Sequence, residues 1–187
     1  MVITANDVKV LRERTGAGIM ECKRALEEAA GSMDKATDIL RQQGLAKAEK
    51  KAGRTAAQGV IEPYIHAGGR IGSLVEVNCE TDFVARTSDF KTLAHDIAMQ
   101  VAATSPRFLR EDEIPAEAWP ALESEFGDRK RALETVSLLD QPYIRDSRAT
   151  VGDLVKAAIG KLGENIVVRR YARFEVGAAQ AESFDSE

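Results

Sequence analysis

The sequence predicts an α+β protein, in which a small N-terminal domain of three helices precedes a core of antiparallel β-sheet with packed helices. Apolar residues at helical spacing fill the first 45 residues, two alternating strands flank a glycine turn near residue 68, and further helices precede a last strand. The 187 residues include 26 basic and 30 acidic ones, for a net charge of −4. This composition is typical of a globular protein and makes nucleic-acid binding by the whole chain a weak hypothesis.

The first helix is expected to begin after Thr4. Thr4 can act as its cap because Asp7 lies three residues later, where a capping carboxylate is placed. Val8 and Leu11 fall on one side of this helix. The sequence TGAG at 15–18 ends the pattern, since two glycines free the backbone for a tight turn.

The second helix is expected over about 19–29, with a buried stripe made of Ile19, Cys22, Leu26 and Ala29. The third has its stripe at Met33, Ala36 and Leu40, and Gly44 is its expected stop. Met20 points about 100° away from Ile19 on a helix, so one narrow face cannot bury both. The pattern alone leaves two interpretations of this pair open, core packing and contact with a partner.

A change of charge predicts a boundary near residue 55. Residues 1–57 hold 11 basic and 8 acidic residues, whereas the rest of the chain holds 15 and 22. We therefore divide the chain into a three-helix domain at 1–45, a basic linker at 46–57, an α+β core at 58–176 and a disordered acidic tail at 177–187.

The core is expected to open on a hairpin, with a strand over 60–66, a turn over 67–70 and a partner strand over 71–79. Helices should follow from about Ser88, over 116–135 and over 151–162, the last ended by Gly163. The final strand covers 165–176. Its alternation places Ile166, Val168, Ala172, Phe174 and Val176 on one face, and Val167, Arg169, Tyr171 and Arg173 on the other.

Few residues suggest covalent chemistry. The glycine turn follows a helix and lacks Gly-Lys-Ser/Thr, so the phosphate-loop hypothesis fails. Cys22 lies on a buried stripe, and a nucleophilic role for Cys79 has no supporting histidine or second cysteine nearby in sequence. His66 and His95 belong to no recognisable triad or ligand set, and we expect no metal or cofactor. No apolar run reaches the length of a membrane span and no signal-peptide core is present, which favours the cytoplasm.

The segment NCETDFVAR at 78–86 joins a strand to a helix and permits two interpretations. In one, Thr81 or Asp82 caps a short helix and Phe83 packs into the core. In the other, Asp82 and Phe83 form an exposed acidic and aromatic tip, of the kind that anchors in a partner's pocket.

Three segments together resemble the bacterial elongation factor Ts family. They are VKVLRERTGAGIMECKRAL at 8–26, GRTAAQGVIEPYIHAGGRIGSLVEVNCETDFVAR at 53–86 and KLGENIVVRRYARFEVG at 161–177. The resemblance implies a ubiquitin-associated-like N-terminal domain before the α+β core. It also implies a protein that is not an enzyme but an exchange factor, which binds the GTPase EF-Tu and promotes release of GDP so that GTP can replace it.

The resemblance carries roles onto particular residues. The N-terminal domain would dock on the nucleotide-binding domain of EF-Tu through Leu11, Arg12, Ile19 and Met20. The tip would disturb the Mg²⁺ site of EF-Tu through Thr81, Asp82, Phe83 and Val84. Further family positions that contact EF-Tu are matched by His66, Leu162 and Gly163, where the contact can also come from a second copy.

The chain resembles the short form of the family, in which two copies form a dimer, and a 2:2 complex with EF-Tu is then expected. The apolar face of strand 165–176 is our candidate dimer surface, and Ala172 excludes the intersubunit disulfide of some short members. We expect no nucleic-acid or membrane partner. Two competing hypotheses are a binder of RNA or of a ubiquitin-like protein, suggested by the basic linker with Arg169 and Arg173, and an enzyme that uses Cys79.

Overall fold

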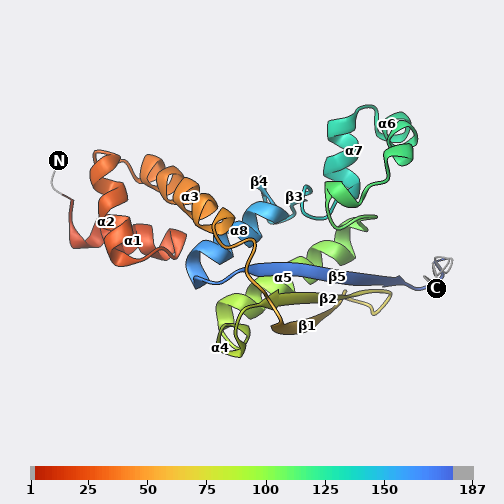
Figure 1. Ribbon diagram of the computed structural model, residues 1–187, viewed down its shortest axis with the longest axis horizontal. Helices are drawn as coiled ribbons and strands as arrows, with labels where there is room; N and C mark the ends of the chain where they lie inside the picture. The colour runs from red at the N-terminus through yellow and green to blue at the C-terminus, as the bar shows by residue number, and fades with distance from the viewer. Residues whose placement is uncertain (1–2, 179–187) are drawn as a thin grey trace.

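The computed structural model describes residues 3–178 and confirms the α+β class. Figure 1 shows an elongated molecule, with three N-terminal helices at one end, a sheet in the middle and a helical hairpin at the other end. The predicted disordered tail lies outside the described residues from residue 179 onward. The helices are α1 (Ala5–Thr15), α2 (Ile19–Glu28), α3 (Met33–Glu49), α4 (Asp82–Ala85), α5 (Ser88–Thr104), α6 (Trp119–Phe126), α7 (Arg129–Val136) and α8 (Val151–Leu162). The strands are β1 (Gln58–Ile65), β2 (Ile71–Cys79), β3 (Pro142–Tyr143), β4 (Asp146–Thr150) and β5 (Ile166–Glu175).

The N-terminal helices begin and end for the reasons that the sequence predicts. Thr4 and Asp7 form a capping box at the start of α1, with the Thr4 N–H donating to the Asp7 carboxylate at 2.9 Å. Gly16 ends α1 in the left-handed conformation, at a φ of 68°. The three helices enclose a small core of their own, made of Leu11, Cys22, Ala25, Leu26, Ala29, Ala36 and Leu40.

The expected stop of the third helix at Gly44 is wrong, because α3 continues to Glu49. A glycine inside a helix costs only about 1 kcal/mol relative to alanine. Ala48, one turn beyond it, is buried in the main core, and α3 packs along α8. Tertiary packing therefore extends the helix past a residue that favours termination.

The central sheet has the antiparallel order β1-β2-β5, and its inner face packs against α5. The predicted alternation of β2 is confirmed, since Val75, Val77 and Cys79 are fully buried on that face. The main core also takes in α8, so the sheet is covered by helices on one side (Figure 1).

The predicted faces of the last strand are wrong beyond Val168. Glu76 pairs with Arg170 and Val77 pairs with Val168, so Arg169 is an extra residue in a β-bulge. The bulge reverses the alternation. Tyr171 then donates to the Pro106 carbonyl at 3.0 Å and Arg173 donates to the Ala102 carbonyl at 3.0 Å, both on the helix side of the sheet. Phe174 and Val176, in contrast, are exposed.

The single helix predicted over 116–135 is also wrong. Gly127 takes a φ of 96°, and the Asp128 side chain caps a new helix by accepting from the Arg131 N–H at 2.8 Å. The chain therefore forms the hairpin α6–α7, with its own small core of Ile114, Trp119, Leu122, Ala132 and Val136. The short β3–β4 ladder that follows was not predicted.

Candidate functional site

The segment Thr81–Val84 forms a short tip between β2 and α5. Thr81 has extended backbone, and its Oγ1 accepts from the Val84 N–H at 3.4 Å, which caps the four-residue helix α4. Asp82 pairs with Arg86 one turn later at 2.7 Å. One part of the first interpretation from sequence is therefore confirmed, because Thr81 does cap a short helix.

The other part of that interpretation is wrong, because Phe83 does not enter the core. Phe83 is 79% exposed, whereas Ala85 two residues later is buried. Val84 packs against the main core from a half-buried position. Val84 and Ala85 therefore anchor α4 to the core, while the Phe83 ring faces solvent, as the interpretation with an exposed tip expects.

Cys79, the last residue of β2, contacts the backbone of the tip. Its thiol donates to the Thr81 carbonyl at 3.1 Å, and the residue is fully buried. Burial raises the pKa of the Cys79 thiol, and the nearby Glu164 charge adds to the effect. A nucleophilic cysteine needs a lowered pKa and access to substrate. The structure therefore gives the hypothesis of an enzyme that uses Cys79 no support.

At the N-terminal domain, Ile19 and Met20 begin α2 directly after the glycine turn, and they are 59% and 65% exposed. The expected place of Ile19 on the buried stripe is wrong, although Cys22, Leu26 and Ala29 are buried as predicted. The first turn of α2 projects beyond the three-helix core, so both side chains lie on the surface. This apolar pair is available to a partner.

The other two N-terminal candidates differ in exposure. Arg12 lies on the surface of α1, whereas Leu11 is fully buried within the three-helix core. Leu11 therefore packs inside the domain and exposes no side-chain surface to a partner.

The glycine turn contacts the core beside the tip. A Cβ atom on Gly16 would lie 2.8 Å from Cδ of Lys161, so this α8 side chain crosses the turn. The Lys161 ammonium lies 2.8 Å from the Asp89 carboxylate, at the start of α5. The end of α8 therefore joins the turn before Ile19 to α5, the helix that follows the tip.

The remaining candidates lie apart from the tip or support it. His66 is exposed beside the hairpin turn, with Nδ1 3.2 Å from the Tyr64 hydroxyl. Leu162 packs against the main core, and Gly163 ends α8 at a φ of 80°. Glu164, the next residue, accepts hydrogen bonds from Thr81 and was missed. Its only signal in the sequence was its place within the segment LGEN.

The outer face of the sheet, opposite α5, has no helix from residues 3–178 packed over it and carries several exposed apolar side chains beside the Glu76–Arg170 ion pair. Ile61, Ile65, Leu74, Phe174 and Val176 are all exposed there or at its edge. Only two of the five belong to the strand that the sequence singled out. The outward residues of β1 and β2 were missed, because their exposure follows from the one-sided cover of the sheet and not from their own alternation.

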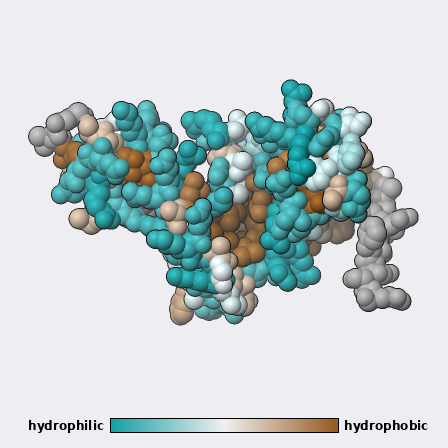
Figure 2. Space-filling view, turned by 45° about the horizontal axis from the view of Figure 1, so that its top comes forward, coloured by the Kyte–Doolittle hydropathy of each residue, from teal (hydrophilic) through white to brown (hydrophobic). Residues whose placement is uncertain are grey.

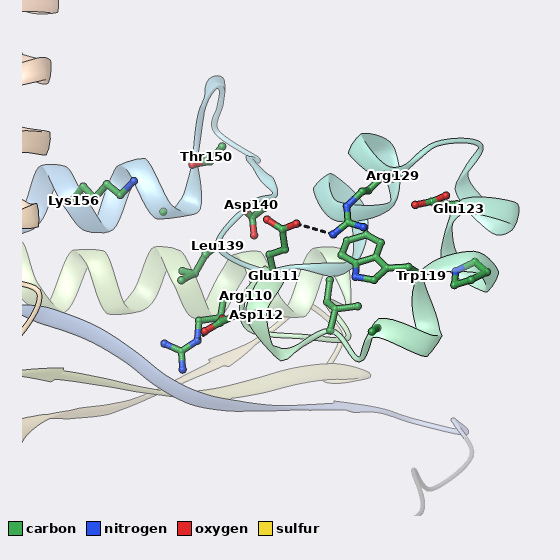
Figure 3. A pocket seen from close by; sticks show the side chains of 14 residues that line it. Arg110, Glu111, Asp112, Trp119, Glu123, Arg129, Leu139, Asp140, Thr150 and Lys156 are labelled. Atoms are coloured by element: carbon green, nitrogen blue, oxygen red, sulfur yellow. Dashed lines mark hydrogen bonds and ion pairs between the residues drawn. The ribbon is translucent and has the colours of Figure 1, made fainter.

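An open cleft of about 960 Å³ lies between the α6–α7 hairpin and the start of α8 (Figure 3). In it Arg129 stacks on Trp119, 3.7 Å from the ring centroid, and pairs with Glu111 at 3.2 Å. The cleft contains none of the predicted site residues.

Figure 2 shows hydrophobic side chains gathered in a hollow near the middle of the molecule, with hydrophilic residues over most of that face.

Within residues 3–178, no group of three or more His, Cys, Asp or Glu side chains has an arrangement that could hold a metal ion. None of the helices described there is both long and apolar enough to cross a bilayer.

Comparison with known proteins decides the family. The family model described as Elongation factor TS matches residues 30–128, more than half of the chain and including the whole tip. The chain belongs to the elongation factor Ts family. The Elongation factor Ts of Carboxydothermus hydrogenoformans is 51% identical over 208 aligned positions, which cover all of this chain and 96% of that protein. Those of Syntrophomonas wolfei and Moorella thermoacetica are 50% and 48% identical, and they cover 98% and 97% of this chain and 95% and 99% of their own lengths.

Proposed function

We propose that this protein is the guanine nucleotide exchange factor of the translational GTPase EF-Tu and acts in the cytoplasm without covalent chemistry. The observation that carries the proposal is the exposed Phe83 ring on a capped, core-anchored tip, in a chain of the elongation factor Ts family. The factor binds EF-Tu·GDP, loosens the nucleotide and remains on the empty GTPase until GTP enters.

The tip acts as a wedge at the Mg²⁺ site of EF-Tu. Mg²⁺ demands near-octahedral oxygen geometry, so a displacement of about an ångström in one ligand-bearing element weakens its hold on the nucleotide. Burial of Phe83 in a pocket of EF-Tu supplies free energy of order 2–4 kcal/mol for that displacement. Asp82 competes for hydrogen bonds near the site once it leaves Arg86.

Docking and exchange are divided between two surfaces. The N-terminal domain holds the nucleotide-binding domain of EF-Tu through Ile19, Met20 and Arg12, while the tip disturbs the nucleotide. Because exchange is catalytic, bound factor must weaken nucleotide binding and nucleotide must weaken factor binding equally. An apolar pair and one exposed aromatic ring suit a complex that forms and dissociates in each cycle.

Two copies of the chain form a dimer through the outer face of the sheet. That face joins exposed apolar side chains from all three strands, and a second sheet laid on it would complete a two-layer sandwich. The dimer would bind two EF-Tu molecules. His66 lies beside the hairpin turn at the end of this sheet, where a contact from the second copy would fall.

The test is the release rate of fluorescent GDP from EF-Tu, measured with wild-type protein, Phe83→Ala and Ile144→Ala. Ile144 is an exposed apolar residue in the β3–β4 turn, which makes it a matched control. We expect strong acceleration by wild type and the control, and at least a tenfold smaller effect with Phe83→Ala. No acceleration by wild type would overturn the function, and equal acceleration by Phe83→Ala would overturn the wedge.

A further inference from the structure

Three donors converge on one carboxylate behind the tip. Glu164 follows α8 and accepts from the backbone N–H groups of Glu80 at 3.1 Å and Thr81 at 3.0 Å. Its other oxygen accepts from the Thr81 hydroxyl at 2.6 Å. Thr81 and Glu164 are 83 positions apart in the chain, so these hydrogen bonds join the tip to the turn that follows α8.

The contact is reciprocal. The Glu80 carboxylate accepts from the Asn165 N–H at 2.7 Å and lies 3.6 Å from the Arg54 guanidinium. The buried Asn165 side chain in turn donates to the Arg54 carbonyl at 2.7 Å. The turn after β2 and the turn after α8 therefore each supply a carboxylate that accepts from the backbone of the other. Arg54, at the end of the linker, contacts both turns.

The end of α8 brings Glu164 to the tip. Gly163 is left-handed, so α8 ends there and the chain turns back toward the β2–α4 junction. Every group that faces Glu164 in these bonds is a donor, and an ionised carboxylate is an acceptor at both oxygens. Glutamine would present an NH₂ group to one of the donors, and aspartate is one methylene shorter.

We infer that Glu164 is a positioning residue for the tip, Thr81–Val84, and that it holds Thr81 so that α4 presents Phe83 in one orientation. A four-residue helix has no stability of its own and depends on its cap. The Thr81 hydroxyl has a single proton, and giving it to Glu164 leaves a lone pair aimed at the Val84 N–H. This inference rests on the proposed role of Phe83.

A positioned wedge and a mobile wedge differ in a measurable way. Docking by the N-terminal domain does not involve Glu164, so the factor concentration for half-maximal exchange should change little. The maximal rate of GDP release should fall about tenfold, the order expected for one charge-assisted hydrogen bond. A ring that must be ordered during each encounter contributes less to displacing the Mg²⁺ ligands.

The first experiment needs no EF-Tu. Amide hydrogen exchange of wild type, Glu164→Gln, Glu164→Asp and Glu125→Gln is followed at residues 84 and 85, whose N–H groups bond to Thr81. Glu125 pairs with Arg107 at 2.5 Å and provides the matched control on α6. We expect at least tenfold faster exchange at these amides in Glu164→Gln, a smaller effect in Glu164→Asp and none in Glu125→Gln. Equal protection in all four proteins would overturn the inference.

The second experiment is a double-mutant cycle on GDP release from EF-Tu with Glu164→Gln and Phe83→Ala. If Glu164 acts through the ring, its substitution lowers the maximal rate in the wild-type background and has no further effect beside Phe83→Ala. Equal losses in both backgrounds would show a merely structural role and overturn the inference. Failure of the proposed function has a different signature, because wild-type protein would then not accelerate GDP release. Failure of the wedge alone would leave the rate unchanged by Phe83→Ala. Thermal unfolding confirms that each variant folds, and Glu164→Asp replaces Glu164→Gln in the cycle if the latter does not.

Discussion

Gly160 of α8 and Gly44 of α3 lie face to face, so that a Cβ atom on Gly160 would be 3.1 Å from the Gly44 Cα. The contact is asymmetric, because a Cβ on Gly44 would meet no atom of residues 3–178 within 4 Å apart from the backbone of its own helix. This close approach sets the distance between α3, the last helix of the N-terminal domain, and α8, which ends next to Glu164.

The asymmetry predicts opposite effects from substitutions at the two facing glycines. Gly44→Ala should raise the free energy of unfolding by about 0.5–1 kcal/mol, because alanine favours the helix and fills open space. Gly160→Leu should lower it by about 1–3 kcal/mol, since the two backbones must separate. Urea unfolding of both variants tests this, and a stabilised Gly160→Leu protein would contradict the close contact.

The apolar pair at the start of α2 predicts a separation of binding from stability. Met20→Ala should weaken binding to EF-Tu by about 5- to 30-fold, the loss of 1–2 kcal/mol at an interface. Its free energy of unfolding should stay within about 0.5 kcal/mol of wild type, since Met20 is exposed. Isothermal titration against nucleotide-free EF-Tu measures the binding.

Leu26→Ala is the matched contrast on the same helix. Leu26 is fully buried, so its truncation should cost about 2–5 kcal/mol of stability in the N-terminal domain. Unchanged EF-Tu affinity in Met20→Ala would remove Met20 from the docking surface, whatever the result for Leu26.

The sequence predicts a feature of this structure where nearby residues determine it, and fails where packing against a distant segment determines it. Caps such as Thr4 and Thr81, and the left-handed Gly16 and Gly163, act within a few residues, so the sequence predicts them. The bulge at Arg169 depends on registration with β2, which alternation along one strand does not reveal. The continuation of α3 past Gly44 likewise depends on α8, more than 100 residues later.

The site was predictable to the same extent. The pattern offered Asp82 and Phe83 as an exposed tip but also allowed Phe83 to be buried, and only the family resemblance favoured the tip. Glu164 could not be assigned from pattern, since its partners lie 83 and 84 positions away. A carboxylate after a helix-ending glycine has no distinctive spacing, and only the fold shows what it holds.

The bulge leads to a prediction about assembly. Because it turns Phe174 to the outer face of the sheet, Phe174→Arg should place a charge in the proposed dimer interface and convert dimers to monomers. Sedimentation equilibrium at micromolar concentration tests this, with Ile144→Arg as the control for a charge at an exposed apolar site. A wild-type protein that is monomeric at about 100 μM would contradict the dimer.

The link between α2 and α3 predicts a loss of stability in acid. Glu21 accepts from Lys47 and from the Gly18 N–H at 3.2 Å, and the Lys47 hydrogen bond holds the pKa of Glu21 below the value of 4.5 of an unperturbed glutamate. A pKa lowered by folding stabilises the native state above the unfolded value, and this stability is lost as the pH falls through the folded value. Because the Lys47 side chain is 40% exposed, the contribution is a few tenths to about 1 kcal/mol. Glu21→Gln should therefore lower the free energy of unfolding by that amount at pH 7 and leave it nearly unchanged near pH 3, as measured by urea unfolding at both pH values. An equal loss at the two pH values would mean that the Glu21 charge has no part in joining the helices.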